Sequence, residues 1–262
     1  MPLYTADALV LRTYKLGESD RIVVFLTEDR GKKRGVAKGA RRPRSRFTGA
    51  LEPLTQARIA YFEWERRELV GLNYAEPARS PLAGRPDALG HVGYFAELLD
   101  QWSPEGDPSE RLYRLGASMT EALAGDVPIE VLARYFEFWL LRLQGVYPSL
   151  GGCDACGRGL EEPDGGAWLA AERGVFTCGA CAGRRGARVS PGGLAFLRAA
   201  RRLAPRNLGA VSVTPGVLGE LERVHRVLMD RYLERELRST RVLRDLRRLA
   251  VDTPARAADS RR

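Results

Sequence analysis

The four cysteines of the chain form two Cys-x-x-Cys pairs, Cys153 with Cys156 and Cys178 with Cys181. Each pair can present two thiolates from one short turn, and two such turns supply the four soft ligands of a tetrahedral zinc site. The 21 residues between the pairs slightly exceed the loop of a usual zinc ribbon, but the pattern remains specific. Two disulfides in a secreted protein are the alternative, and nothing else in the sequence points to export. We therefore predict a Zn²⁺ site with these four ligands.

The predicted zinc ion is expected to be structural. A catalytic zinc ion keeps an open coordination position, and four cysteine ligands leave none. The two histidines, His91 and His225, lie far apart in the sequence and in no zinc-enzyme pattern, and no nucleophile elbow or phosphate-binding loop is present. We expect no enzyme activity. A zinc-dependent deaminase or nuclease is a weaker alternative, which would need a carboxylate such as Glu172 beside an open metal position.

A densely basic segment spans residues 30–46 and holds nine Lys and Arg residues and no acid. So much like charge repels itself unless an anion is nearby, which favours a track for a phosphate backbone over a solvated loop. Gly31, Gly35 and Gly39 would let this segment approach the backbone closely. The candidate DNA contacts in the segment are Arg30, Lys32, Lys33, Arg34, Lys38, Arg41, Arg42, Arg44 and Arg46.

Aromatic residues that could stack on nucleobases lie close to this segment in the sequence. In a strand, Phe62 and Trp64 share one face with Arg58, while Tyr61 lies on the other face. We predict that Phe62 or Trp64 lies on the open face and contacts bases, and that Tyr61 lies in the core. A second basic region, residues 238–248, either adds a DNA contact or forms a solvated helical face.

The composition agrees with a polyanion as partner. The net charge is +9 and the isoelectric point is about 9.7, with two basic ends around an acidic middle. No signal peptide and no apolar run of about 20 residues is recognisable, so we expect a cytoplasmic protein whose thiols stay reduced.

Residues 1–80 read as five short strands, at about 9–11, 22–26, 34–38, 57–64 and 69–74. Five strands in so short a segment predict a closed barrel of the oligonucleotide/oligosaccharide-binding (OB) type, with an open SH3-like barrel as the alternative. The fold class is thus mixed, an all-β barrel followed by an all-α domain. The predicted domains are the barrel (1–80), a helical domain in two parts (81–150 and 189–250), a zinc loop (151–188) between them and a disordered tail (251–262).

Apolar residues recur at helical spacing from residue 81 onward. Two short strands are predicted between the cysteine pairs, and Ser190-Pro191 predicts the start of a helix that ends near 203. One long amphipathic helix is predicted over 217–249, and its inward residues are Leu221, Val224, Leu228, Tyr232 and Leu237.

Four segments in the same order resemble the bacterial RecO family of recombinational repair proteins. They are residues 5–27, which contain Gly17-Glu-Ser-Asp20; residues 35–54, which contain Gly35-Val-Ala-Lys-Gly-Ala-Arg41; residues 136–156, which contain Gly145-Val-Tyr-Pro148; and, more loosely, residues 236–241.

This resemblance implies an N-terminal OB domain, a helical domain and a zinc loop that not all members keep. It implies a role without catalysis, in which the protein binds single- and double-stranded DNA and anneals complementary strands. The implied partners are RecR, in some bacteria RecF, and the acidic-apolar C-terminal tail of single-strand binding protein (SSB), on whose DNA complexes the RecA recombinase is loaded. A zinc-ribbon transcription or ribosome-associated factor is the alternative function.

Overall fold

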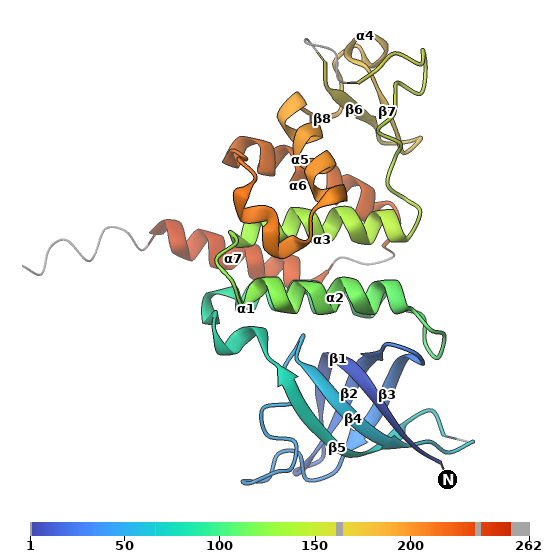
Figure 1. Ribbon diagram of the computed structural model, residues 1–262, viewed down its shortest axis with the longest axis vertical. Helices are drawn as coiled ribbons and strands as arrows, with labels where there is room; N and C mark the ends of the chain where they lie inside the picture. Colours follow the sequence, from blue (N-terminus) through green and yellow to red (C-terminus); the bar gives the residue numbers. More distant parts are fainter. Residues whose placement is uncertain (1, 66, 161–164, 234–236, 253–262) are drawn as a thin grey trace, which may run out of the picture. The chain divides into compact units, whose positions relative to one another are not determined.

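The computed structural model describes residues 2–65, 67–160, 165–233 and 237–252, which form two compact units. The barrel unit combines residues 2–107 with residues 237–252, and the helical unit comprises residues 108–233 (Figure 1). The barrel unit therefore contains two segments that are distant in the sequence.

Five strands form a closed barrel in the order β1-β2-β3-β5-β4. The pairing of β4 with β1 closes the barrel. All neighbouring strands are antiparallel except β3 and β5, which run parallel and pair through only two residue pairs. This is the strand arrangement of an OB fold, so the prediction is confirmed and the alternative of an open SH3-like barrel is wrong. The strands are β1 (Leu3–Leu16), β2 (Asp20–Thr27), β3 (Gly31–Ala37), β4 (Gln56–Phe62) and β5 (Val70–Arg79).

The barrel interior is filled with apolar side chains from alternate strand positions. Phe25 of β2 and Tyr61 of β4 are both fully buried, and their rings meet edge to face with centroids 5.6 Å apart. Phe47 and Leu51, from the segment between β3 and β4, belong to the same core. Because the interior is packed, a ligand of this barrel has to bind on its outer surface or at an opening between strands.

Helix α1 (Leu89–Trp102) packs against α7 (Arg238–Asp252) within the barrel unit. Two short 3₁₀ turns, η1 (Pro81–Ala83) and η2 (Pro86–Ala88), lead into α1. The carboxylate of Glu97 in α1 accepts hydrogen bonds from the first backbone N–H groups of α7, at 3.2 Å from Arg238 and 2.7 Å from Ser239. Burial raises the pKa of Glu97, but the bonds from Ser239 and Arg238 outweigh it and hold the pKa below its usual value.

The helical unit is built around α3 (Ile129–Leu143), which packs against α2 (Glu110–Leu123) and α6 (Pro215–Asp230). Helix α5 (Pro191–Arg202) and the 3₁₀ helix η3 (Pro205–Ala210) complete it. The Ser190 hydroxyl accepts a hydrogen bond from the N–H of Gly193, which confirms the predicted start of α5.

A buried polar network joins α3 to α6. Glu137 accepts hydrogen bonds from Arg134 at 2.8 Å and bonds His225 Nδ1 at 2.9 Å, while the Tyr147 hydroxyl lies 3.2 Å from His225 Nε2. Both nitrogens of His225 are therefore engaged in this packing.

The zinc loop forms a small three-stranded sheet in the order β7-β6-β8. Its strands are β6 (Ala167–Ala170), β7 (Val175–Thr177) and β8 (Ala187–Val189), and the one-turn helix α4 (Gly179–Ala182) follows β7. The two strands predicted between the cysteine pairs correspond to β6 and β7.

The single helix predicted over 217–249 is wrong. The chain forms α6 in the helical unit and α7 in the barrel unit, and Tyr232, predicted to point inward, is 46% exposed. The break occurs because α7 begins where Glu97 caps it, and this tertiary contact leaves no trace in the apolar period of the segment. By their contacts, residues 81–107 and 237–252 belong to the same compact unit as the barrel, and the predicted domain boundaries stay a prediction. Of the predicted disordered tail, 251–252 are the end of α7, and 253–262 lie outside the described residues.

Candidate nucleic-acid interface and metal centre

Lys32 is the one basic side chain of the 30–46 segment that is buried, at 8% exposure. Its ammonium group donates to the carbonyl oxygen of Asp100 at 2.6 Å and lies 3.4 Å from a carboxylate oxygen of the same residue. The backbone of Lys32 also bonds to Pro104 and Gly106, which follow α1. Lys32 remains a predicted DNA contact, but its burial and its pairing with Asp100 argue against that role, because its charge is compensated within the protein.

The other basic residues of the strand half, residues 30–34, each have an acidic partner. These pairs are Lys33 with Glu63 at 2.6 Å, Arg34 with Glu105 at 2.8 Å and Arg30 with Asp29 at 3.5 Å. The Arg30 guanidinium also lies over the ring of Tyr4. Arg30, Lys33 and Arg34 remain predicted contacts, but their half of the segment presents little net charge to a ligand.

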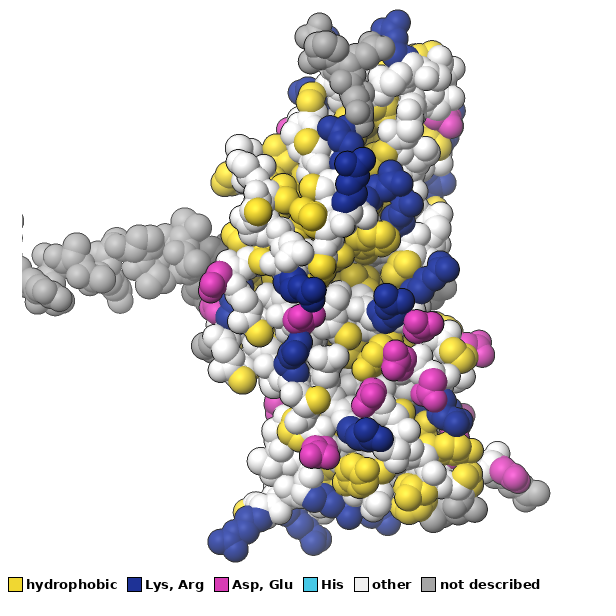
Figure 2. Space-filling model, in the orientation of Figure 1, with side chains coloured by type: hydrophobic (Ala, Val, Ile, Leu, Met, Phe, Trp, Pro, Cys, Tyr) yellow, Lys and Arg dark blue, Asp and Glu magenta, His cyan; other side chains and the backbone are white. Residues whose placement is uncertain are grey.

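The remaining basic residues of the segment are exposed in the turns between β3 and β4. Within the described part of the chain, no acidic side chain forms an ion pair with any of them. Figure 2 shows basic side chains projecting from the end of the barrel where this segment lies. We call this group the basic loop, and it consists of Lys38, Arg41, Arg42, Arg44 and Arg46.

The basic loop is held in place by hydrogen bonds to the turn between β1 and β2 and to the first residue of β2. Gly39 has a φ of +69°, and its N–H donates to the carboxylate of Asp20 at 2.8 Å. This bond is the main reason why the pKa of Asp20 lies below its usual value. The guanidinium of Arg41 donates to the carbonyl oxygens of Gly17 and Glu18, at 3.2 and 2.8 Å. These neutral acceptors order Arg41 without cancelling its charge.

The two predicted base-contacting aromatics, Phe62 and Trp64, are half-buried, whereas Tyr61 lies in the core as expected. Both half-buried rings line a cleft that Lys38 and Arg46 of the basic loop also border. Arg67 borders it as well, with its guanidinium 5.1 Å from the centre of the Trp64 ring. Arg67 is not among the predicted contacts, and no pattern in the sequence indicates its position beside Trp64.

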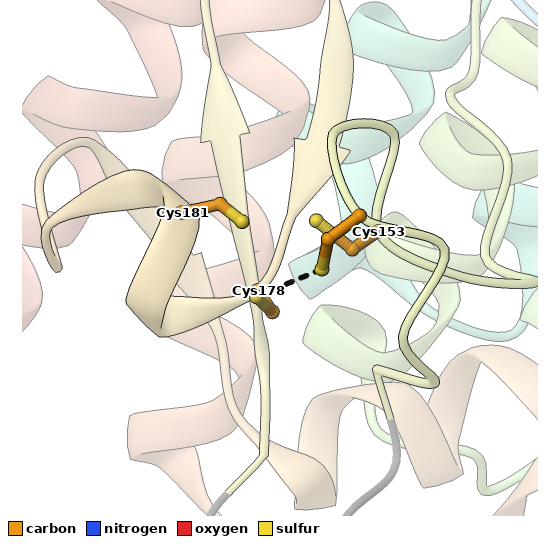
Figure 3. Close-up of side chains that lie close together, drawn as sticks. Cys153, Cys178 and Cys181 are labelled. Atoms are coloured by element: carbon orange, nitrogen blue, oxygen red, sulfur yellow. Dashed lines mark hydrogen bonds between the residues drawn. The ribbon is translucent and has the colours of Figure 1, made fainter.

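The four cysteine side chains converge from the loop after α3 and from the start of α4, as Figure 3 shows for Cys153, Cys178 and Cys181. All four sulfur atoms lie within 4.8 Å of one another, and those of Cys156 and Cys178 are 3.8 Å apart. With Zn–S bonds of about 2.3 Å, a tetrahedral site places its sulfurs about 3.8 Å apart. All four thiols are free. These cysteines can therefore bind a metal ion, and the donor set suits Zn²⁺.

The backbone around the sulfurs favours thiolates. Burial raises the pKa of Cys153, but N–H groups of Cys178, Cys156 and Ala155 bond to its sulfur and lower the pKa to about 6. The N–H of Cys181 is the main cause that lowers the pKa of Cys178. The pKa of Cys181 itself is raised to about 12, chiefly by its contacts with Cys156 and Cys178. A divalent cation bound among the four sulfurs would compensate the thiolates that this backbone favours.

Each cysteine turn is also tied to the small sheet. The N–H of Asp154 donates to the carbonyl oxygen of Phe176 in β7, and left-handed Gly157 and Gly183 end the two turns. Glu172, the carboxylate that a zinc enzyme would need, is exposed in the turn between β6 and β7. Among the described residues, the group that could hold a metal ion consists of the four cysteines alone. In that part of the chain, no helix has both the length and the apolar character needed to span a membrane.

A closed five-stranded OB barrel with an exposed basic loop, in one chain with a helical unit and a four-cysteine centre, defines a multidomain protein of the oligonucleotide-binding class. The family models described as "Recombination protein O N terminal" and "Recombination protein O C terminal" match residues 1–81 and 84–241. The chain therefore belongs to the RecO family of DNA repair proteins.

Curated relatives named DNA repair protein RecO agree with this assignment. The protein of Geobacter metallireducens is 37% identical over 242 residues, which cover 92% of this chain and 96% of the relative. That of Heliobacterium modesticaldum is 33% identical over 267 residues, covering 99% and 96%. A 166-residue match to the protein of Koribacter versatilis is 39% identical and covers 61% of this chain and 66% of the relative.

Proposed function

We propose that this protein binds single- and double-stranded DNA through the basic loop and anneals complementary strands without nucleotide hydrolysis. The observation that supports this proposal is that the loop presents five exposed cations, and none of them forms an ion pair with an acidic side chain among the described residues, although Asp20 lies near Lys38 and Arg42. Such cations can neutralise phosphates and release counterions. When two strands are neutralised on one surface, their mutual repulsion falls and base pairing can proceed.

In the cell, this activity would serve recombination mediation. The protein would help to load RecA onto DNA coated by SSB, acting with RecR and in some bacteria with RecF, and it would contact the C-terminal tail of SSB. Membership of the RecO family supports this role. The four cysteines would hold a structural Zn²⁺, whose chemistry when bound is to stabilise the fold of the small sheet.

The test compares two double charge reversals on the same barrel. Arg42→Glu with Arg44→Glu removes two basic-loop cations, and Arg58→Glu with Arg79→Glu makes the same charge change at exposed positions on β4 and β5. In the first variant, log affinity for single strands should fall less steeply with log salt. The slope should be smaller in magnitude by about 1.4, since each phosphate contact contributes about 0.7. The second variant should leave the slope close to that of the wild type.

Annealing is measured with complementary oligonucleotides coated with SSB and with no nucleotide added. The wild type and the β4–β5 variant should anneal them, and the basic-loop variant should be slower. An unchanged salt slope in the basic-loop variant would move the DNA site elsewhere. If the folded wild type fails to anneal at low salt, the mediator role is contradicted.

A further inference from the structure

The helical unit contains a cleft of its own, between helix α5 and the turn that holds the first cysteine pair. Its volume is about 540 Å³, within the range of sites for small organic ligands. One wall is the chain on either side of that cysteine pair, with Leu150 and Gly151 before it and Gly159 and Leu160 after it. The other wall is α5, and every residue that lines the cleft belongs to the helical unit.

The α5 wall of this cleft is strongly basic. Arg198, Arg201 and Arg202 all border the cleft, and no acidic residue is among the described residues that line it. Arg201 and Arg202 are exposed, and within the described part of the helical unit neither forms an ion pair. Arginines in the last turn of a helix are favoured by its dipole, but this does not explain why three of them share one cleft. Three like charges in one concave site repel one another unless an anion lies between them.

The remaining surface of the cleft is apolar and is held by backbone hydrogen bonds. Leu160 and Leu194 are buried and form part of it. The N–H of Cys153 donates to the carbonyl oxygen of Arg158 at 2.8 Å, and the carbonyl oxygen of Leu160 accepts from the N–H of Gly166 at 3.0 Å. These bonds give the cysteine wall a defined shape, so the cleft is pre-organised. A ligand that fits has clustered negative charges on the side of α5 and an apolar part on the side of the leucines.

A nucleoside polyphosphate combines these properties. Its phosphate chain carries several negative charges close together, which guanidinium groups bind through charge-assisted hydrogen bonds. Its base has flat apolar faces that can rest against leucine side chains. The backbone of a nucleic acid instead distributes its charges along an extended track, which suits an open surface better than an enclosed cleft.

We propose that this cleft binds a free nucleoside polyphosphate, with the phosphates on Arg198, Arg201 and Arg202 and the nucleoside against the leucines. The site is separate from the proposed DNA-binding function, because all of its residues lie in the helical unit. The chain has no phosphate-binding loop of the ATPase type, so the ligand is bound without hydrolysis. Because one wall is the first cysteine turn, bound ligand stabilises that turn.

The experiment measures binding of ATP and of inorganic tripolyphosphate by calorimetry, with the full chain at physiological salt. Arg201→Gln with Arg202→Gln should weaken ATP binding roughly 10- to 100-fold, because two charge-assisted contacts are lost. The matched control is Arg184→Gln with Arg185→Gln, which changes an adjacent pair of exposed arginines after α4, outside the cleft. The control should change the affinity less than about twofold. Tripolyphosphate should bind more weakly than ATP, since it leaves the leucines without a partner.

Hydrogen exchange locates the bound ligand. ATP should slow exchange of the amides in residues 150–160 and in the second half of α5, and this protection should be lost in Arg201→Gln with Arg202→Gln.

The inference is overturned if the folded wild type binds neither probe at about 1 mM, a concentration at which even a weak site is half filled. It is also overturned if both double variants weaken ATP binding equally, because ATP is then attracted to the basic protein in general. Equal affinities for ATP and tripolyphosphate would overturn the assignment of the nucleoside. If ATP displaces a single-stranded oligonucleotide from the wild type and not from Arg201→Gln with Arg202→Gln, the cleft belongs to nucleic acid and the inference fails.

Discussion

The cysteine cluster and the basic loop both concentrate groups of like charge, and they differ in where the compensation has to come from. The four sulfurs converge to within 4.8 Å of one another, so their thiolates need a cation between them. The side chains of the basic loop are exposed to solvent, and none forms an ion pair with an acid of the described chain, although Asp20 lies near Lys38 and Arg42. A cation bound among the four sulfurs would stabilise the fold, whereas a basic surface without ion pairs is available to an anionic partner.

Removal of the metal should produce the largest effect and tests the first half of this comparison. Structural zinc contributes apparent free energies of about 10–16 kcal/mol in small zinc-finger peptides, so a chelator should unfold the sheet of β6, β7 and β8. The measurements are elemental analysis, which should give one zinc per chain, and hydrogen exchange of the amides in β6 and β7. DNA affinity should change less than threefold, because the basic loop lies in the barrel unit.

The control for metal removal is the double variant Cys153→Ser with Cys178→Ser. The amides of β6 and β7 in this variant should exchange hydrogen as fast as those of the chelated wild type, and adding the chelator should not change their exchange further. A native exchange pattern in protein that has been shown to be free of metal would mean that the fold alone holds the cysteines together.

The next effect concerns Lys32, which is compensated from inside although it belongs to the basic segment. Lys32→Met leaves the carboxylate of Asp100 half of its pairing and should lower the free energy of unfolding by about 3–5 kcal/mol. Lys33→Met removes a more exposed pair with Glu63 and should cost no more than about 1 kcal/mol. Urea unfolding measures both values. Equal free energies of unfolding for the two variants would show that the deeper burial of Lys32 does not make its ion pair more stabilising than that of Lys33.

The barrel and the metal centre could be predicted from the sequence because their signals are local. Strand alternation placed Tyr61 in the core, and the spacing of the cysteines identified four ligands that the fold brings together. The acidic partners of the basic residues in segment 30–34 could not be predicted in this way. Asp100 and Glu105 come from the end of α1 and the segment after it, so only the tertiary structure reveals that Lys32 and Arg34 are paired.

The path of the C-terminal segment was hidden for the same reason. Its apolar period continues through residues 217–249, but α7 belongs to the barrel unit, and its first turn is capped by Glu97 of α1. The cleft beside Trp64 depends on Gly71 and on the weak pairing of β3 with β5, and neither has a signature in composition or spacing.

The smallest expected effect decides how far the interface extends along the basic segment. Arg34 is 54% exposed and pairs with Glu105, which is 59% exposed, so Arg34→Gln should change the free energy of unfolding by less than about 1 kcal/mol. It should also leave the salt dependence of DNA binding nearly unchanged, whereas Arg42→Gln should lower the slope by about 0.7. The difference follows from Glu105, since a guanidinium that is already paired releases few counterions when it meets a phosphate. Glu105→Gln should therefore make the slope steeper, and an additional Arg34→Gln should then lower it by as much as Arg42→Gln does. If Arg34→Gln alone lowers the slope as much as Arg42→Gln, the carboxylate does not shield Arg34, and the strand half belongs to the interface together with the basic loop.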